Sequence, residues 1–223
     1  LQPFGEEFAR WFWPVSGTLA MVLVVRRYGL SLLWLAWPPF LEGAFRGAVD
    51  YTLLGLVATG GGAITALTKP YAAPLLLWER RWAAFVAAGL VAVASFPLLP
   101  WPQFISNWTR IEGVIAPQSS NLSAWGHPAL MVAAGIALLS LRRDGLILAT
   151  PALWPHAQLH YSIFSIRIAA ASPILALGLA MPIVGAAPAA VVVYAIWRLI
   201  DRGGSARVAN HNSANGGHRS PVR

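Results

Sequence analysis

The chain alternates long apolar stretches with short groups of charged residues. The apolar runs are about 14 to 20 residues long, close to the roughly 20 residues that a bilayer-spanning helix needs. Three arginine pairs separate them: Arg26-Arg27, Arg80-Arg81 and Arg142-Arg143. Because a charge in the middle of a bilayer costs several kcal/mol, this pattern predicts an all-α, polytopic integral membrane protein.

We expect about seven or eight transmembrane helices within residues 1–200, followed by a disordered basic tail over 201–223. The apolar runs that could cross fully are Trp11–Val25, Tyr51–Leu67, Trp82–Leu98, Pro128–Leu141, Gly145–His156, Ile168–Val184 and Ala186–Ile200. One or two further segments should be broken or re-entrant. Leu30–Ala44 contains Pro38-Pro39, and Tyr71–Trp78 is too short to cross.

Composition agrees with this prediction. Of the 223 residues 57% are hydrophobic and only 11% are charged, compared with about 25% charged in typical soluble domains. The net charge is +8, and we expect it to meet anionic membrane lipids rather than nucleic acid. The absence of cysteine excludes disulfides and thiolate metal sites, and we expect no metal or cofactor.

Few ionisable residues lie in or near the apolar segments, and such residues are functional candidates by default. They are Glu42, Asp50, Lys69, His156, His160 and Arg167. We interpret the two acidic residues as solvated members of a short connection. Lys69 precedes a proline at the end of an apolar run, where its ammonium either binds a phosphate or reaches the membrane surface as an ordinary interfacial lysine.

Two of these candidates, His156 and His160, are four residues apart and would share one face of a helix. No His-Glu-x-x-His motif accompanies them, so a metal site is the weaker interpretation. A polar cluster that lines a substrate cavity, with Arg167 one or two turns further on, is the favoured one.

Several segments together resemble a known family. They are Trp37–Phe40, Gly47–Leu54, Leu67–Leu77, Arg80–Trp82, Gln118–Asn121 and Pro151–Tyr161. Their order is similar to that in the multi-span, C-type (GT-C) bacterial glycosyltransferases that use polyprenol-phosphate-mannose. The resemblance covers roughly Pro38 to Pro173.

This resemblance implies a multi-pass protein of the bacterial plasma membrane. It would transfer a sugar, mannose by analogy, from a polyprenyl-phosphate donor to an extracytoplasmic glycan or lipid acceptor. Lys69, His156, His160 and Arg167 have the chemistry to bind the lipid phosphate. The family's catalytic carboxylate has no convincing equivalent, because Glu6 and Glu7 precede what looks like a middle span. The resemblance therefore implies that the family's amino-terminal portion is missing.

Two other functions fit the same pattern. A non-catalytic membrane subunit or assembly protein would need only the small-residue helix contacts that Gly60–Gly62 offers. A small-solute transporter would use the broken segments to flank a central site, although the chain shows no internal repeat.

Overall fold

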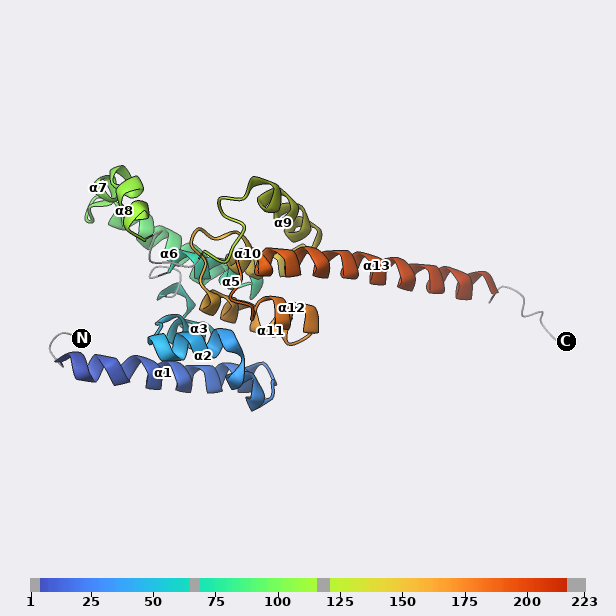
Figure 1. Ribbon diagram of the computed structural model, residues 1–223, viewed down its shortest axis with the longest axis horizontal. Helices are drawn as coiled ribbons and strands as arrows, with labels where there is room; N and C mark the ends of the chain where they lie inside the picture. The colour runs from blue at the N-terminus through green and yellow to red at the C-terminus, as the bar shows by residue number, and fades with distance from the viewer. Residues whose placement is uncertain (1–4, 65–68, 116–120, 216–223) are drawn as a thin grey trace.

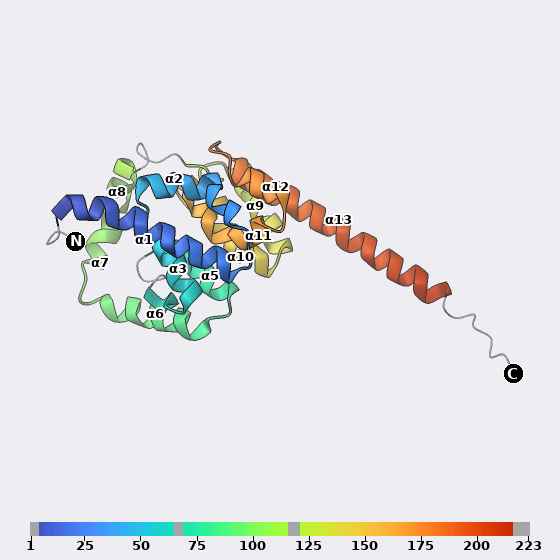
Figure 2. The same cartoon turned by 90° about the horizontal axis from the view of Figure 1, so that it is seen from below.

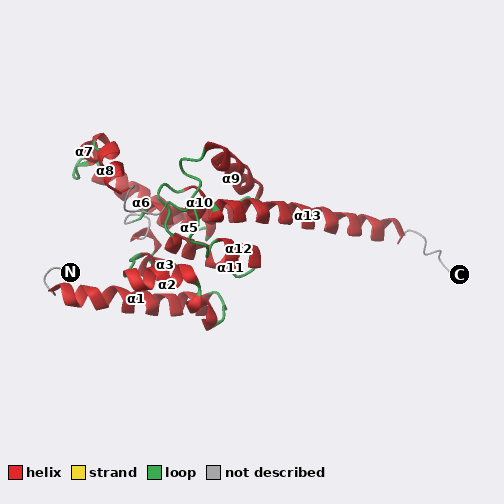
Figure 3. Cartoon of the chain, in the orientation of Figure 1, coloured by secondary structure: helices red, strands yellow, loops and turns green. Residues whose placement is uncertain are grey.

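The computed structural model describes residues 5–64, 69–115 and 121–215, and within these ranges it contains helices and no strand (Figures 1 and 3). The prediction of an all-α chain is therefore confirmed. The α-helices are α1 (Gly5–Arg27), α2 (Pro38–Arg46), α3 (Asp50–Thr59), α5 (Ala73–Trp78), α6 (Trp82–Ser95), α7 (Trp101–Ser106), α8 (Trp108–Ile115), α9 (Pro128–Ser140), α10 (Arg143–Leu153), α11 (Ile166–Ala169), α12 (Pro173–Gly178) and α13 (Ala186–Asn215). The 3₁₀ helices are η2 (Leu32–Ala36), η3 (Pro70–Ala72) and η5 (Leu159–Ser165).

The prediction of a polytopic membrane protein with seven or eight transmembrane helices is wrong. In the part of the chain that the structure describes, no helix combines the length and the apolar character needed to cross a bilayer. Helix α6, for example, has 14 residues, or about 21 Å at 1.5 Å per residue, against roughly 30 Å of hydrocarbon.

Glycine and proline divide several of the apolar runs into short helices. The run from Tyr51 stops at Gly60, whose φ of 112° ends α3. The run from Leu30 is interrupted at Pro38-Pro39, as its prolines predicted, and a new helix, α2, starts there. Proline fits the first helical turn because that turn leaves N–H groups unbonded. Helices α5, α7, α9 and α12 likewise have a proline at their first or second residue.

Helix α10 lies at the centre of the fold and packs against α5, α9, α13 and η5. Its buried face contributes Ile147, Leu148 and Ala152 to a core that extends to α1 and α3. Figure 1 shows α1 along one side of the body and α6 to α8 on another, and Figure 2 shows α13 projecting away from the body. The boundary that we placed after Ile200 falls inside α13, which continues to Asn215.

Helices α9 and α10 approach each other so closely that only glycine fits at position 145. A Cβ atom there would lie 2.1 Å from the carbonyl oxygen of Leu138. We expect Gly145→Ala to lower the free energy of unfolding by about 3 kcal/mol, because backbone must move to admit the methyl group.

The matched control is Gly135→Ala on α9, where the added Cβ has no neighbour within 4 Å. This change should stabilise by about 0.5 to 1 kcal/mol through helix propensity alone. Urea unfolding of the two variants beside the parent chain is the measurement. Equal stabilities for both alanine variants would contradict the close packing of α9 and α10.

Candidate functional site

Two carboxylates hold the imidazole of His160 between them. Its Nδ1 lies 2.8 Å from Oε2 of Glu42, on α2, and its Nε2 lies 3.3 Å from Oδ2 of Asp50, the first residue of α3. The backbone N–H of His160 also donates to Glu42 Oε2, at 3.2 Å. Because both ring nitrogens face carboxylate acceptors, the imidazole donates from both and is an imidazolium.

Burial alone would oppose charge on all three groups, but their mutual contacts outweigh it. Burial acts to lower the pKa of His160, yet its hydrogen bonds and its attraction to Asp50 and Glu42 hold that pKa above the ordinary value. Burial acts to raise the pKa of each carboxyl group, yet the hydrogen bonds and charge of His160 hold both below their ordinary values. The three groups therefore form an ionised, mutually dependent cluster.

Tyr71 joins this cluster through its hydroxyl, which donates to Asp50 Oδ1. Burial and the charge of Asp50 raise the pKa of Tyr71, so the phenol keeps its proton. Its ring stacks on Tyr161 with centroids 4.2 Å apart, and its carbonyl accepts from the Thr150 hydroxyl at 2.8 Å. These contacts fix Tyr71, and through it Asp50, in one orientation. We call Glu42, Asp50, Tyr71, His160 and Tyr161 the acid–histidine cluster.

Lys69 lies at the border of the acid–histidine cluster. Its Nζ is 5.5 Å from the centroid of the Tyr71 ring, and its charge contributes to the lowered pKa of Asp50, after the larger effects of burial, His160 and Tyr71. Lys69 is half-buried, whereas Asp50 and His160 are only 2% and 5% exposed. Glu42 is also partly exposed, at 21% of its side chain, and pairs with the exposed Arg46. Solvent therefore reaches the cluster at Lys69 and at Glu42.

An apolar groove of about 430 Å³ begins at Pro70, next to Lys69. It runs between the start of α5 and the length of α6 and ends at Leu99 and Trp101. Phe85 and Val91 are among its apolar walls. Lys69 thus directly precedes a lining residue of a groove that suits a hydrocarbon chain.

The structure brings together two of the four residues that the sequence assigned to phosphate binding. Lys69 and His160 belong to the same site, but Arg167 lies elsewhere, over the rings of Tyr28 and Trp78 at 5.6 and 5.1 Å. His156 lies in the turn between α10 and η5 with a φ of 55°. The expectation that His156 and His160 share one helical face is therefore wrong.

The sequence identifies the two carboxylates as candidates but does not place them in the site. The interpretation of Glu42 and Asp50 as solvated residues of a short connection is wrong for Asp50, which is 2% exposed and pairs with His160 of η5. Glu42 keeps 21% of its side chain exposed, but it too pairs with His160, 118 residues further along the chain. The available signal was the place of Asp50 at the start of an apolar helix, where a carboxylate is favoured by the helix dipole.

Three of the segments that carry the family resemblance meet in this cluster. Asp50 comes from Gly47–Leu54, Lys69 and Tyr71 come from Leu67–Leu77, and His160 and Tyr161 come from Pro151–Tyr161. The Gln118–Asn121 element lies mostly outside the described residues. No group of histidine, cysteine and acidic side chains in the described ranges is arranged to hold a metal ion.

Comparison of the chain with protein-family models, with curated proteins and with solved structures found no match.

Proposed function

We propose that the chain transfers a sugar from a polyprenyl-phosphate donor to a hydroxyl acceptor, with mannose as the sugar that the resemblance implies. The observation that carries the proposal is the convergence of Lys69, Asp50 and His160, distant in sequence, beside an apolar groove. In this scheme the groove holds the polyprenyl chain and Lys69 binds the phosphate.

The transfer needs a base for the acceptor and a cation for the leaving group. The acceptor oxygen forms a bond to the anomeric carbon while the bond from that carbon to the phosphate oxygen breaks, and its electron pair leaves with the phosphate. Lys69 stabilises the charge on the departing polyprenyl phosphate. Glu42, the partly exposed carboxylate of the cluster, takes the proton of the acceptor hydroxyl.

Lys69→Met should weaken the binding of polyprenyl phosphate by about tenfold or more, the loss expected when one charge-assisted hydrogen bond of roughly 1.5 to 3 kcal/mol is removed. Lys69→Arg should retain part of the affinity, because the charge stays while its geometry changes. The measurement is equilibrium binding of polyprenyl phosphate in detergent micelles to the purified chain. The same experiment is run with polyprenol, which lacks the phosphate.

The control is Arg10→Met, which removes an exposed cation of α1 that is not part of the site. It should bind polyprenyl phosphate as the parent chain does. The proposed role of Lys69 fails if the parent chain, Lys69→Met and Lys69→Arg bind polyprenyl phosphate equally, or if polyprenol binds as tightly as its phosphate. Appearance of sugar on a mannoside acceptor, with release of polyprenyl phosphate, tests the transfer itself.

A further inference from the structure

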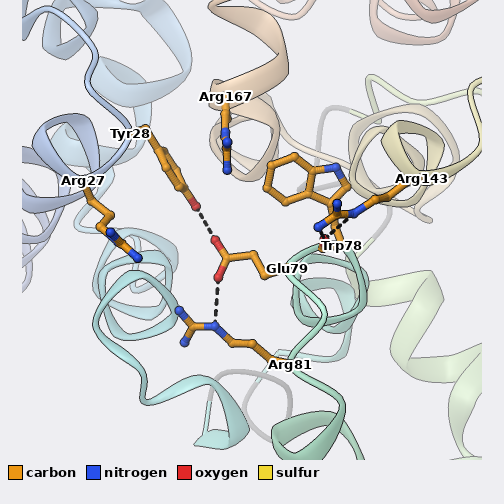
Figure 4. A pocket seen from close by; sticks show the side chains of 7 residues that line it. All are labelled: Arg27, Tyr28, Trp78, Glu79, Arg81, Arg143 and Arg167. Atoms are coloured by element: carbon orange, nitrogen blue, oxygen red, sulfur yellow. Dashed lines mark hydrogen bonds and ion pairs between the residues drawn. The ribbon is translucent and has the colours of Figure 1, made fainter.

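A second polar site lies at the other end of the central helices. Three segments connect it to the acid–histidine cluster, and each covers the distance in seven residues. They run from Tyr71 to Trp78, from Thr150 to Arg143 and from His160 to Arg167. Seven residues of helix span about 10 Å, so the two sites are separate. The second site is a cavity of about 530 Å³, which we call the arginine pocket. Its lining residues are Arg27, Tyr28, Trp78, Glu79, Arg81, Arg143 and Arg167 (Figure 4).

The second member of each arginine pair lines this pocket. Arg27 ends α1, Arg81 precedes α6 and Arg143 begins α10. The sequence indicated that these pairs mark membrane boundaries, but the fold brings one arginine from each to a common cavity. Figure 4 shows them, with Arg167 of α11, placed around Glu79.

Two of the turns that deliver these side chains are strained. Arg80 and Arg142, the residues directly before Arg81 and Arg143, have φ angles of 61° and 55°. This left-handed conformation is uncommon for residues other than glycine and costs of order 1 kcal/mol or more at each position. The fold nevertheless holds both turns in this conformation, directly before two arginines that line the pocket.

The pocket carries more positive charge than it neutralises. Its only lining carboxylate, Glu79, is already engaged, because Oε2 lies 2.9 Å from Arg81 Nε and Oε1 accepts from the Tyr28 hydroxyl at 2.8 Å. Within the described residues Arg27, Arg143 and Arg167 form no ion pair. Four guanidinium groups against one carboxylate leave a formal excess of three positive charges.

One guanidinium nitrogen of an arginine that lines the pocket is a buried donor without an acceptor among the described residues. Nη1 of Arg81 is buried and has no hydrogen-bond partner in the described part of the chain. A buried donor without an acceptor costs free energy that a bound acceptor atom would recover. Arg143 and Arg167 lie over the Trp78 ring, at 5.3 and 5.1 Å. Nε and Nη2 of Arg143 also donate to the Trp78 carbonyl oxygen, so its remaining N–H groups are the ones open to a ligand (Figure 4).

We propose that the arginine pocket binds a phosphate-bearing anion, at least doubly charged, through Arg27, Arg81, Arg143 and Arg167. Guanidinium groups match the tetrahedral oxygens of phosphate with paired N–H donors. A cavity of about 530 Å³ is of the size that holds a small organic ligand, so the phosphate is carried on a larger group. That group is a free metabolite or a lipid headgroup. The proposal does not depend on the transfer reaction proposed above.

The test is calorimetric titration of the full chain with inorganic pyrophosphate at low salt. We expect binding that weakens as salt is added, because exposed charges are screened. Arg81→Met and Arg167→Met should each raise Kd about tenfold or more, and the corresponding lysine variants should recover part of the affinity. Arg110→Met, which removes an exposed cation of α8, should bind as the parent chain does.

Glu79→Gln keeps all the arginines and is expected to strengthen the binding of the anion, in contrast to the arginine variants. It should lower Kd for pyrophosphate severalfold, because it removes the only negative charge that lines the pocket. This variant keeps the experiment decisive if the arginine variants do not fold.

Vesicles identify the source of the phosphate. Phosphatidylcholine vesicles with and without phosphatidic acid are floated with each chain. Binding of pyrophosphate that the arginine variants lose supports a free ligand. Binding of phosphatidic-acid vesicles alone, lost in the same variants, supports a headgroup. Failure to bind either, or equal binding by parent and arginine variants, would overturn the proposal.

Discussion

His160→Gln is expected to lower the free energy of unfolding by about 3 to 5 kcal/mol, the cost of removing one partner from a buried ion pair. The imidazolium lies between Glu42 and Asp50, and glutamine cannot supply its charge. Asp50 is 2% exposed, so without His160 its carboxylate is buried with only the Tyr71 hydroxyl and the distant charge of Lys69 to stabilise it. Urea unfolding near pH 6 gives the value.

The same cluster predicts how stability depends on pH. His160 has a raised pKa in the folded chain, so its contribution is full below its ordinary pKa of about 6.5 and is lost as the pH rises through the raised value. The carboxyl groups have lowered pKa values, so their contribution is full above about 4 and is lost as the pH falls through the lowered values. Stability should therefore be greatest between about pH 4 and 6.5 and should depend less on pH in His160→Gln.

Two controls separate this ion cluster from a general loss of packing. His127→Gln changes an exposed histidine before α9 and should leave unfolding unchanged. Combining His160→Gln with Asp50→Asn should cost less than the sum of the two single changes, because the neutral amide no longer needs the imidazolium. Additive losses, or a loss below about 1 kcal/mol for His160→Gln, would show that the pairs contribute little.

Local sequence patterns predicted the parts of this fold that local chemistry decides. The apolar runs become helices, and the prolines at positions 38 and 39 interrupt the run from Leu30 as expected. In the described part of the chain no run becomes a membrane span. Glycine or proline ends several of the runs early, as Gly60 ends α3 after 10 residues. The mean hydropathy of a run does not show where a helix ends within it. Gly60, in the left-handed conformation, ends α3 inside such a run.

The candidate site was predictable only in part, for a similar reason. Lys69 and His160 stood out because a charge in an apolar neighbourhood is visible in the sequence. Glu42 and Asp50 stood out for the same reason, but their pairing with His160 of η5 was not predicted, because no local pattern records a contact with a segment more than 100 residues away. The sequence shows the arginine pairs only as separators between apolar runs. Their convergence in one pocket is a property of the tertiary fold.

Glu42→Gln is expected to reduce sugar transfer by about 10² to 10⁴-fold, the contribution usual for a general base. The amide still accepts a hydrogen bond from His160 Nδ1, but it cannot take a proton from the acceptor hydroxyl. In the parent chain burial acts to raise the pKa of Glu42, while the hydrogen bond and charge of His160 hold it below the ordinary value. The carboxylate is therefore ionised, as a base must be, throughout the neutral range.

Binding and transfer must be measured together to assign this role. Glu42→Gln should bind polyprenyl phosphate as the parent chain does, in contrast to Lys69→Met, because the base acts only on the acceptor. Glu7→Gln, an exposed change of the same type on α1, should leave both quantities unchanged. Transfer by folded Glu42→Gln at the parent rate would remove Glu42 from the reaction. Loss of binding and transfer together would instead show that Glu42→Gln disturbs the site as a whole, and would leave Glu42 without support as the base.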